Sequence, residues 1–532
     1  MKTLYTNAKV YTGGPDLQES FIVEDGIFTH VGSAESLSVL PADNTVDLGG
    51  AFVCPGFIDS HMHVLNYGKA LTMAPLHART YSLEDMIACL RETPPAESGW
   101  ILGRGWNQDL FSDVSRMPDR HDLDRVSTEF PVCATRACGH ALSVNTKALE
   151  ILGITADTPQ MDGGEIVMED GYPNGVFLDN AMDIVLDAIP APGIEDVKAM
   201  LRAAMKALNG YGITSCHSDD YFACHGLDWH TVNQAYRELE AAGEMTVRVY
   251  QQANFTNVPA LSAFIGEGNI TGAGTDMFRI GPLKLLGDGA LGARTAYLTN
   301  PYADDPSARG LSVFRPEEFD ALIGCAHENG MQVAVHTIGD ACLDLVLSAI
   351  EKAQAEKPRT DHRHGIVHCQ ITRPDQLDRI AANRLHVYAQ SIFLDYDIHI
   401  VEKRVGPELA QSSYSWKTLM DKGVTVSNGS DCPVELPRPL AGLQCAVTRS
   451  DLAGCPPYLP REAFTVKEAL DSFTSAGAYA SFEEHRKGRI APGMLADFVV
   501  LGKNPFETAP AAIKDIPVVG TYIGGVRVYA QG

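Results

Sequence analysis

Two histidines one residue apart, His61 and His63, are the residues of this sequence whose type and spacing most directly indicate chemistry. They end an apolar segment that follows a Pro55-Gly56 turn and is typical of a buried strand. Side chains alternate between the two faces of a strand, so both imidazoles point the same way, about 7 Å apart along the chain. This spacing predicts that the pair binds one divalent cation, provided that other segments supply further ligands.

The order of elements along the chain determines which other residues can join this pair. Short apolar runs alternate with turns over residues 1–55 and again over 488–532, which predicts one small discontinuous β-sandwich domain formed by both termini. Between them, over residues 56–487, strand-like runs alternate with helical stretches such as 195–209 and 317–329, as in a parallel α/β fold. The interval of about 66–205 is too long for one crossover, and we interpret it as an inserted subdomain or lid.

Eight strand-like runs occur in the central part, which is the number that closes a (β/α)8 or TIM-like barrel. They are residues 57–63, 212–217, 247–251, 279–285, 332–336, 365–368, 386–390 and 424–428.

Several residues of metal-binding type lie where these strands end. His336 and His368 end the fifth and sixth strands, Asp431 follows the eighth, and Lys284 lies late in the fourth. The active site of such a barrel forms at the carboxyl ends of its strands, so these residues should meet His61 and His63 at one mouth. Histidine nitrogen and carboxylate oxygen are ligands of Zn²⁺ and related metals.

Each of these residues also has a simpler interpretation. A strand-end histidine is often a hydrogen-bonded core residue, Asp431 could cap the following helix, and Lys284 could pair with Asp288. Four histidines and an aspartate at matching strand ends nevertheless favour a metal site with one or two divalent ions, zinc above all.

The composition limits the partners of such a site. The chain has 532 residues, 45% hydrophobic and 20% charged, as in an ordinary globular protein with room for a large domain and a smaller one. A net charge of −25 argues against nucleic acid or an anionic membrane as partner. No run resembles a signal peptide or a membrane span, and the twelve scattered cysteines favour reduced thiols over disulfides or a cysteine metal ligand. We therefore expect a cytoplasmic protein with a small-molecule substrate, and a homodimer stays open.

Longer motifs carry a family resemblance. The chain resembles the metal-dependent amidohydrolases of the urease-related superfamily, in particular the YtcJ-like branch, which includes N-substituted formamide deformylases. The matching segments are 55–63 (PGFIDSHMH), Gly139-His140 with 145–149, 284–296, 336–340, His368, 429–433 (GSDCP) and 488–497.

The resemblance implies a role for each ligand. His61, His63 and Asp431 would hold a more buried metal, and His336 and His368 a second one. In two-metal members a lysine on the fourth strand is carboxylated by CO2 and bridges the ions, and Lys284 stands at that place. An unmodified ammonium has no lone pair for a metal, so Lys284 is a ligand only as a carbamate. The alternative is a mononuclear site with an ordinary lysine.

The expected reaction is hydrolysis of a C–N bond in an amide, an N-formyl group or a cyclic amide. A metal lowers the pKa of water towards 7 and gives an activated hydroxide, while Asp431 takes the proton and returns it to the leaving nitrogen. A lactonase or phosphoesterase on the same site and a catalytically inactive scaffold are the alternatives.

Candidate substrate contacts are less specific. His140, near Arg136 and Gly139 in the insert, and His217, at the end of the second strand, are expected at the mouth, but either could be structural. Arg294 could bind a substrate carboxylate or pair with a neighbouring acid. Trp106, with Trp100, could wall an apolar pocket or belong to the core.

Overall fold

Eight parallel strands form the central sheet of the computed structural model, which describes residues 1–76, 81–137, 140–161, 163–224 and 226–532. Neighbours in the sheet follow chain order, as they do in a (β/α)8 barrel. The strands are β7 (Phe57–Met62), β14 (Ile213–Ser218), β15 (Arg248–Asn254), β16 (Phe278–Leu286), β17 (Val333–Thr337), β18 (Gly365–His368), β19 (His386–Ala389) and β20 (Val426–Asn428). The predicted fold class and all eight predicted strands are confirmed.

The first and last strands of the barrel approach each other through Gly429, which follows β20. A Cβ atom at this position would lie 2.6 Å from the backbone nitrogen of His61, so only glycine permits the approach. Beside it, the buried carboxylate of Asp59 on β7 accepts hydrogen bonds from Ser430, at 3.1 Å from its backbone nitrogen and 2.6 Å from its hydroxyl. These contacts fix the end of β20 against β7.

Helices follow the barrel strands and bury one apolar face each. The two helical stretches expected from the sequence form α7 (Ile194–Gly210) and α10 (Pro316–Glu328). The other connections include α8 (Trp229–Ala241), α9 (Val258–Gly266), α11 (Asp340–Glu356), α12 (Pro374–Ala382), α13 (Leu394–Asp397), α14 (Val401–Ala410), α15 (Trp416–Asp421), α16 (Pro439–Thr448), α17 (Val466–Ser472) and α18 (Ser475–Ala480).

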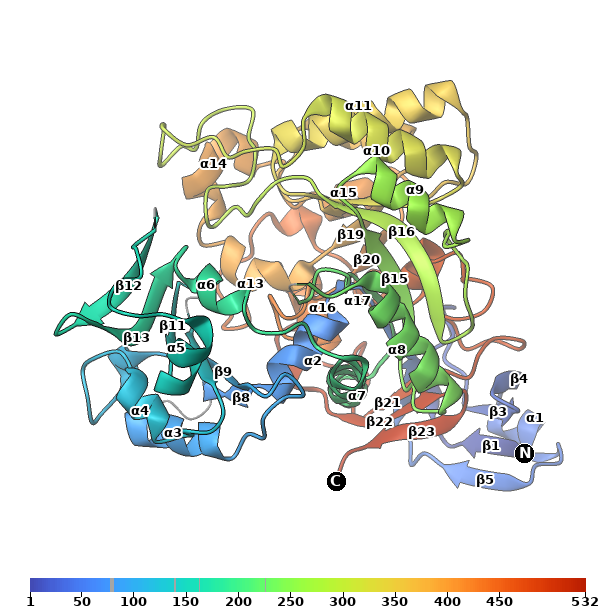
Figure 1. Cartoon of the computed structure of the whole chain (residues 1–532). Coiled ribbons are helices and arrows are strands. Elements are labelled where there is room, and N and C mark those ends of the chain that lie inside the picture. Colours follow the sequence, from blue (N-terminus) through green and yellow to red (C-terminus); the bar gives the residue numbers. More distant parts are fainter. Residues whose placement is uncertain (77–80, 138–139, 162, 225) are drawn as a thin grey trace. The chain divides into compact units, whose positions relative to one another are not determined.

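The strands at the two ends of the chain form two small sheets, which appear in blue and red in Figure 1, and one of these sheets combines strands from both ends. One sheet holds β1 (Lys2–Thr6), β3 (Ser20–Glu24), β4 (Ile27–Gly32) and β5 (Asn44–Asp47); the other holds β2 (Lys9–Val10), β6 (Phe52–Pro55), β21 (Phe498–Leu501), β22 (Val518–Ile523) and β23 (Val526–Ala530). A common apolar core that includes Phe21 and Phe498 lies between them. The buried Asp497 pairs with Arg248 on barrel strand β15 at 2.6 Å, which ties this core to the barrel.

The chain divides into two units. The first consists of Met1–His63, Met205–Asp220 and Met245–Gly532, and the second of Val64–Ala204 and Tyr221–Glu244. The second unit contains a sheet of β8 (Ala74–Pro75), β9 (Ile101–Trp106), β10 (Val132–Arg136), β11 (Ala141–Val144), β12 (Gly164–Glu169) and β13 (Tyr172–Asp179). The domain boundaries inferred from the sequence remain a proposal. None of the helices within the described ranges combines the length and apolarity needed to span a bilayer.

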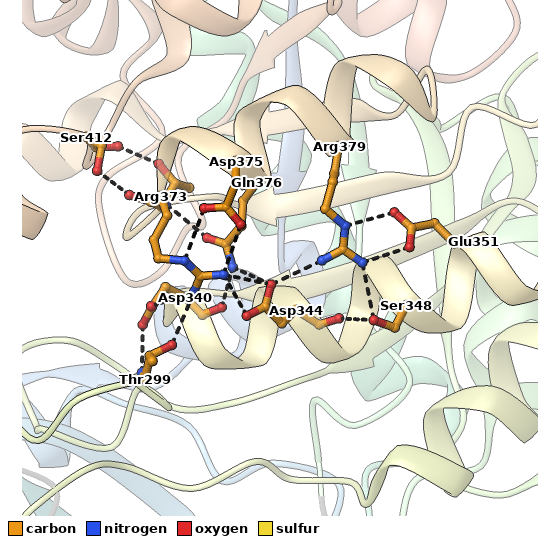
Figure 2. A network of polar contacts seen from close by, with 11 residues as sticks. Thr299, Asp340, Asp344, Ser348, Glu351, Arg373, Asp375, Gln376, Arg379 and Ser412 are labelled. Atoms are coloured by element: carbon orange, nitrogen blue, oxygen red, sulfur yellow. Dashed lines mark hydrogen bonds and ion pairs between the residues drawn. The ribbon is translucent and has the colours of Figure 1, made fainter.

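A charged network fixes the helix that follows the fifth strand (Figure 2). Asp340, at the start of α11, accepts the backbone N–H of Thr299 at 2.9 Å and pairs with Arg373 at 2.9 Å. Arg373 also pairs with Asp344 on the next turn of α11 at 2.8 Å. Because α11 begins directly after β17, this network holds in place the connection that leaves the strand carrying His336.

A second polar network joins three buried histidines between α10 and the segment before β18. His327 donates from Nε2 to the carbonyl of Lys357, and its Nδ1 lies 2.8 Å from Nε2 of His364. The Nδ1 of His364 accepts the backbone N–H of Val333 at 3.0 Å. His362 accepts the N–H of His364 and donates to the carbonyl of Asn383 at 3.1 Å. These partners are all satisfied by neutral imidazoles, with no place for an added proton.

This network should make folding stability fall in mild acid. Burial lowers the pKa of all three rings, to about 4 for His362. The unfolded chain therefore binds protons below about pH 6.5 that the folded chain does not bind, and each such histidine costs up to about 1.4 kcal/mol per pH unit as the pH falls towards the folded pKa. The variant His362→Gln keeps one hydrogen-bond donor and one acceptor. We expect it to reduce the number of protons taken up on unfolding by about one, as measured by urea unfolding between about pH 7 and pH 5.

The exposed His121 provides the control, because its side chain is 72% exposed. His121→Gln should leave the pH dependence of the unfolding midpoint unchanged. An unaltered pH dependence in His362→Gln would show that His362 takes up its proton equally in the folded and unfolded states.

Candidate metal centre

The backbone of the barrel's first and last strands brings three candidate ligands together. Asp431 donates its N–H to the carbonyl of His61, and His63 donates its N–H to the carbonyl of Cys432, both at 2.8 Å. In this arrangement Oδ1 of Asp431 lies 3.4 Å from Nε2 of His61 and 3.1 Å from Nε2 of His63. The predicted His-x-His pair and the aspartate after the eighth strand thus form one buried group.

Residues from the second and third strands orient the two imidazoles. Nδ1 of His63 lies 2.8 Å from the backbone carbonyl of Asp219, which can only accept, so this nitrogen carries the proton. Nδ1 of His61 lies 2.8 Å from Oε1 of Gln252. Both rings therefore present Nε2 to the space beside Asp431, as metal-binding histidines held by a second hydrogen bond do.

His336 and His368 form a second pair at the ends of β17 and β18. Nε2 of His336 lies 3.2 Å from the carbonyl of Gly289, and Nδ1 of His368 lies 2.7 Å from Oε1 of Gln390. The orientation of Gln390 is fixed because its amide donates to the carbonyl of Tyr388. Both outer nitrogens are therefore donors, and the inner nitrogens, Nδ1 of His336 and Nε2 of His368, keep lone pairs.

These two inner nitrogens face each other at 2.9 Å. Two lone pairs at this distance repel unless a cation lies between or beside them. Burial opposes a proton there, because it lowers the pKa of His368 to about 4 and that of His336 well below its usual value. A divalent metal fits better, since two nitrogens at about 2.0–2.1 Å from a tetrahedral ion lie about 3.3 Å apart. The donor set thus suits a metal.

The four rings form one continuous group with Lys284 beside it. Ring centroids lie 5.3 Å apart for His61 and His63, 5.7 Å for His61 and His368, and 4.5 Å for His336 and His368. The side chain of Lys284 on β16 is 3% exposed, and its Nζ lies 3.8 Å from the carboxylate of Asp219. All six predicted metal ligands therefore gather at the carboxyl ends of the strands.

The surroundings affect the ionisation of Asp431 and of Lys284 in different ways. Although burial disfavours ionisation of Asp431, its hydrogen bond with His63 and the neighbouring histidines hold the pKa of this carboxyl well below its usual range. Burial lowers the pKa of Lys284, with partial compensation from Asp219 and Asp431. Asp431 is therefore ionised, while Lys284 is held in surroundings that favour the neutral amine, which is the form that reacts with CO2.

Asp219, rather than Asp288, is the carboxylate beside Lys284. Asp288 instead accepts backbone N–H groups of Ile338 and Gly339, at 3.0 and 2.8 Å, in the connection after His336. One of its oxygens also lies 3.5 Å from Nε2 of His336. Asp288 thus supports the ligand-bearing strand, and the suggested Lys284–Asp288 pair is replaced by this contact.

For two of the candidate substrate contacts, Arg294 and His217, the surroundings match the structural alternative. Arg294 forms a two-point ion pair with Asp304, at 2.9 and 3.1 Å, and is thus held by an acid of its own loop. His217 is completely buried, with its ring centroid 5.0 Å from that of Tyr250, inside the barrel rather than at its mouth. These placements favour structural roles for both residues.

The remaining two predicted contacts belong to the second unit. Trp106 is fully buried in an apolar core and donates from its indole to the carbonyl of Ala134 at 2.9 Å, so its surroundings match the core alternative rather than the pocket wall. The side chain of His140 is 77% exposed and lies 3.1 Å from a carboxylate oxygen of Asp179. Gly139, which the sequence motif includes, lies outside the described residues.

The residues that orient the ligands were not predicted from the sequence. Gln252 lies in the third strand, Gln390 directly follows the seventh, and Asp219 directly follows the second. The rule that placed His336 and His368, namely that strand ends meet at one mouth, applies equally to these positions. A search for amide and carboxylate side chains at every strand end would have found them.

Comparison with known proteins finds similarity along nearly the whole chain. Residues 44–529 match the amidohydrolase family. The chain is 35% identical over 540 residues to the putative amidohydrolase YtcJ of Bacillus subtilis, covering all of both proteins. It is 26% identical over 531 residues to the N-substituted formamide deformylase of Arthrobacter pascens, covering 96% of this chain and 95% of that protein.

A solved structure extends the likeness to three dimensions. An uncharacterised metal-dependent hydrolase from Pyrococcus furiosus superimposes with a TM-score of 0.80 at 27% sequence identity. The match covers 95% of this chain and all of the other.

Proposed function

This chain belongs to the amidohydrolase family, and from that premise we propose that it is a metal-dependent hydrolase of a C–N bond in an amide, an N-formyl group or a cyclic amide. The observation that carries the proposal is the convergence of His61, His63, His336, His368 and Asp431, with inner lone pairs that need a cation. The formamide deformylase among the relatives supports the choice of bond.

Two metal subsites follow from this geometry as a proposal. His61, His63 and Asp431 would hold one ion, and His336 and His368 a second. Lys284 interacts electrostatically with histidines of both groups, and its Nζ lies 3.8 Å from the carboxylate of Asp219. Carboxylation of its amine by CO2 would turn a repelling ammonium into a bridging anion, which fits the lowered pKa of this buried group.

The catalytic roles divide between the bound ions and the chain. Divalent metals supply Lewis acidity, which lowers the pKa of water and polarises a carbonyl. Asp431 is ionised, so it can accept the proton of the attacking water and then donate it to the leaving nitrogen. Gln252 and the carbonyl of Asp219 hold Nδ1 of His61 and of His63 in hydrogen bonds. These two histidines therefore keep their orientation during the reaction, and the proton transfer is assigned to Asp431.

The alternatives make different demands on the site. A lactonase or phosphoesterase could use the same ligands, because the metal centre by itself does not specify the bond that is cut. A catalytically inactive scaffold has no need for lone pairs that converge on a cation, so the intact ligand set argues against it.

A substrate panel tests the proposal. Metal-loaded protein should hydrolyse N-formyl and N-acyl amines with a kcat/KM at least about tenfold above that for lactones and phosphotriesters, a difference of about 1.4 kcal/mol in transition-state binding. Protein treated with a chelator serves as the blank for contaminating hydrolases. Preference for a lactone or phosphotriester would overturn the assignment to C–N bonds, and a lack of any turnover with metal bound would favour the scaffold.

A further inference from the structure

A second group of metal-ligand type lies outside the catalytic cluster. His399, Asp451 and Cys455 each offer one ligand atom, and these atoms all lie within 4.8 Å of one another. His399 lies in the turn between α13 and α14, whereas Asp451 and Cys455 belong to the loop that follows α16. Imidazole, carboxylate and thiolate together form a donor set typical of zinc rather than of magnesium or calcium.

The carboxylate of Asp451 is already oriented for such a role. Its Oδ1 accepts the backbone N–H groups of Gly454 and Cys455 at 2.7 and 2.9 Å. Its Oδ2 faces Nε2 of His399 at 3.0 Å. Hydrogen bonds from the backbone of Cys455 and Gly454 also lower the pKa of this carboxyl, so it is an anion ready to bind a cation.

The sulfur of Cys455 lies on the same side of the loop. The backbone N–H of Asp451 donates to Sγ at 3.5 Å, and the thiol donates to the carbonyl of Pro456 at 3.4 Å. Cys455 is partly exposed, and the side chains of His399 and Asp451 are 51% and 12% exposed. An ion can therefore reach the group from solvent, and water can complete a tetrahedral shell.

We propose that His399, Asp451 and Cys455 bind a zinc ion that cross-links the α13–α14 turn to the loop after α16. Three ligands of a tetrahedral zinc lie about 3.3 to 3.7 Å apart, so the separations between the ligand atoms need to change by about 1.5 Å at most. The thiol proton of Cys455 is released to solvent as the Zn–S bond forms, and no oxidation state changes. This site is independent of the catalytic proposal.

Zinc at this position would order a segment that contacts the barrel mouth. The backbone N–H of Leu452, in the loop after α16, already donates to Asp395 of α13 at 2.6 Å. The segment leading into α13 carries Phe393, whose ring stacks on that of the candidate ligand His368 with centroids 5.8 Å apart. A cross-link here would thus order a segment that contacts the catalytic cluster, as a structural ion and not as a reactant.

Cobalt distinguishes this site from the catalytic one, because the proposed catalytic ligands include no sulfur. The full-length protein loaded with Co²⁺ should show a thiolate-to-cobalt charge-transfer band in the near ultraviolet. Cys455→Ser should lose the band, whereas Cys325→Ser, which alters a similarly partly exposed cysteine, should keep it. His399→Ala should bind one equivalent of metal fewer than the unaltered protein.

Three results would overturn the proposal: a wild-type protein without the band, a band that persists in Cys455→Ser, or an unchanged metal content in His399→Ala. None of these results bears on the proposed hydrolase function. That function is tested separately, by measuring amide hydrolysis with the same protein preparations.

Discussion

Asp431→Asn should reduce kcat by about 10³-fold or more while the protein still folds and retains part of its metal. General acid–base catalysis by a positioned side chain contributes about 10² to 10⁴ to a rate, and asparagine keeps the shape of the side chain but neither holds a negative charge nor carries a transferable proton. The backbone contacts that place residue 431 against His61 and His63 do not involve the carboxylate, so the local fold should survive. Steady-state kinetics with an N-formyl amine, together with metal analysis of the same sample, measures both parts.

The matched control changes an acid far from the mouth. Asp421 has a side chain that is 63% exposed and pairs with Lys417, so Asp421→Asn should leave kcat within about twofold. Near-normal turnover in Asp431→Asn would exclude Asp431 as the proton carrier and require another group at the mouth for this role.

Lys284→Ala should lower kcat/KM by at least about 100-fold, because it removes the group that the two proposed metal subsites share. Small carboxylates such as formate or acetate should restore part of the activity, since they can occupy the space of the lost side chain and supply the two oxygens of a carbamate. The measurement is kcat/KM of the variant as a function of acetate concentration, compared with methylamine at the same ionic strength.

The two additives separate the two interpretations of Lys284. Recovery with methylamine and none with acetate would mean that the lysine acts as an ammonium beside Asp219, and the bridged two-metal site would be ruled out. Intact-mass measurement of the unaltered protein under native conditions should show the added mass of one CO2.

The barrel was predictable because its signals are local. Each strand is a short apolar run ended by a turn, and such runs depend on a few neighbouring residues, so all eight strands could be placed within a few residues. The candidate ligands followed from a general rule, since His336, His368 and Asp431 were found by asking which polar residues end a strand. Chemistry that lies at strand ends is therefore accessible from sequence.

The partners of individual side chains were not predictable in the same way. Arg294 and Asp304 are only ten residues apart, yet whether the arginine pairs with this acid or binds a ligand depends on the conformation of the loop. Trp106 is apolar at its strand position, and burial in a core of the second unit depends on side chains from several elements. Side-chain direction and partner choice in loops require the packed structure, because sequence patterns report only periodicity.

The junction between β7 and β20 also determines when the catalytic cluster can exist during folding. Asp59 and Ser430, whose contact holds this junction, are 371 residues apart in the chain. Contacts of such high sequence separation form late, because a long loop must close before they contribute. During synthesis, the nascent chain therefore has only two of the three ligands of its proposed first metal subsite until the last strand emerges and docks. The proposed first metal subsite is thus complete only when the barrel is complete. Fragments that end before β20 lack Asp431 and should not retain an ion at this subsite.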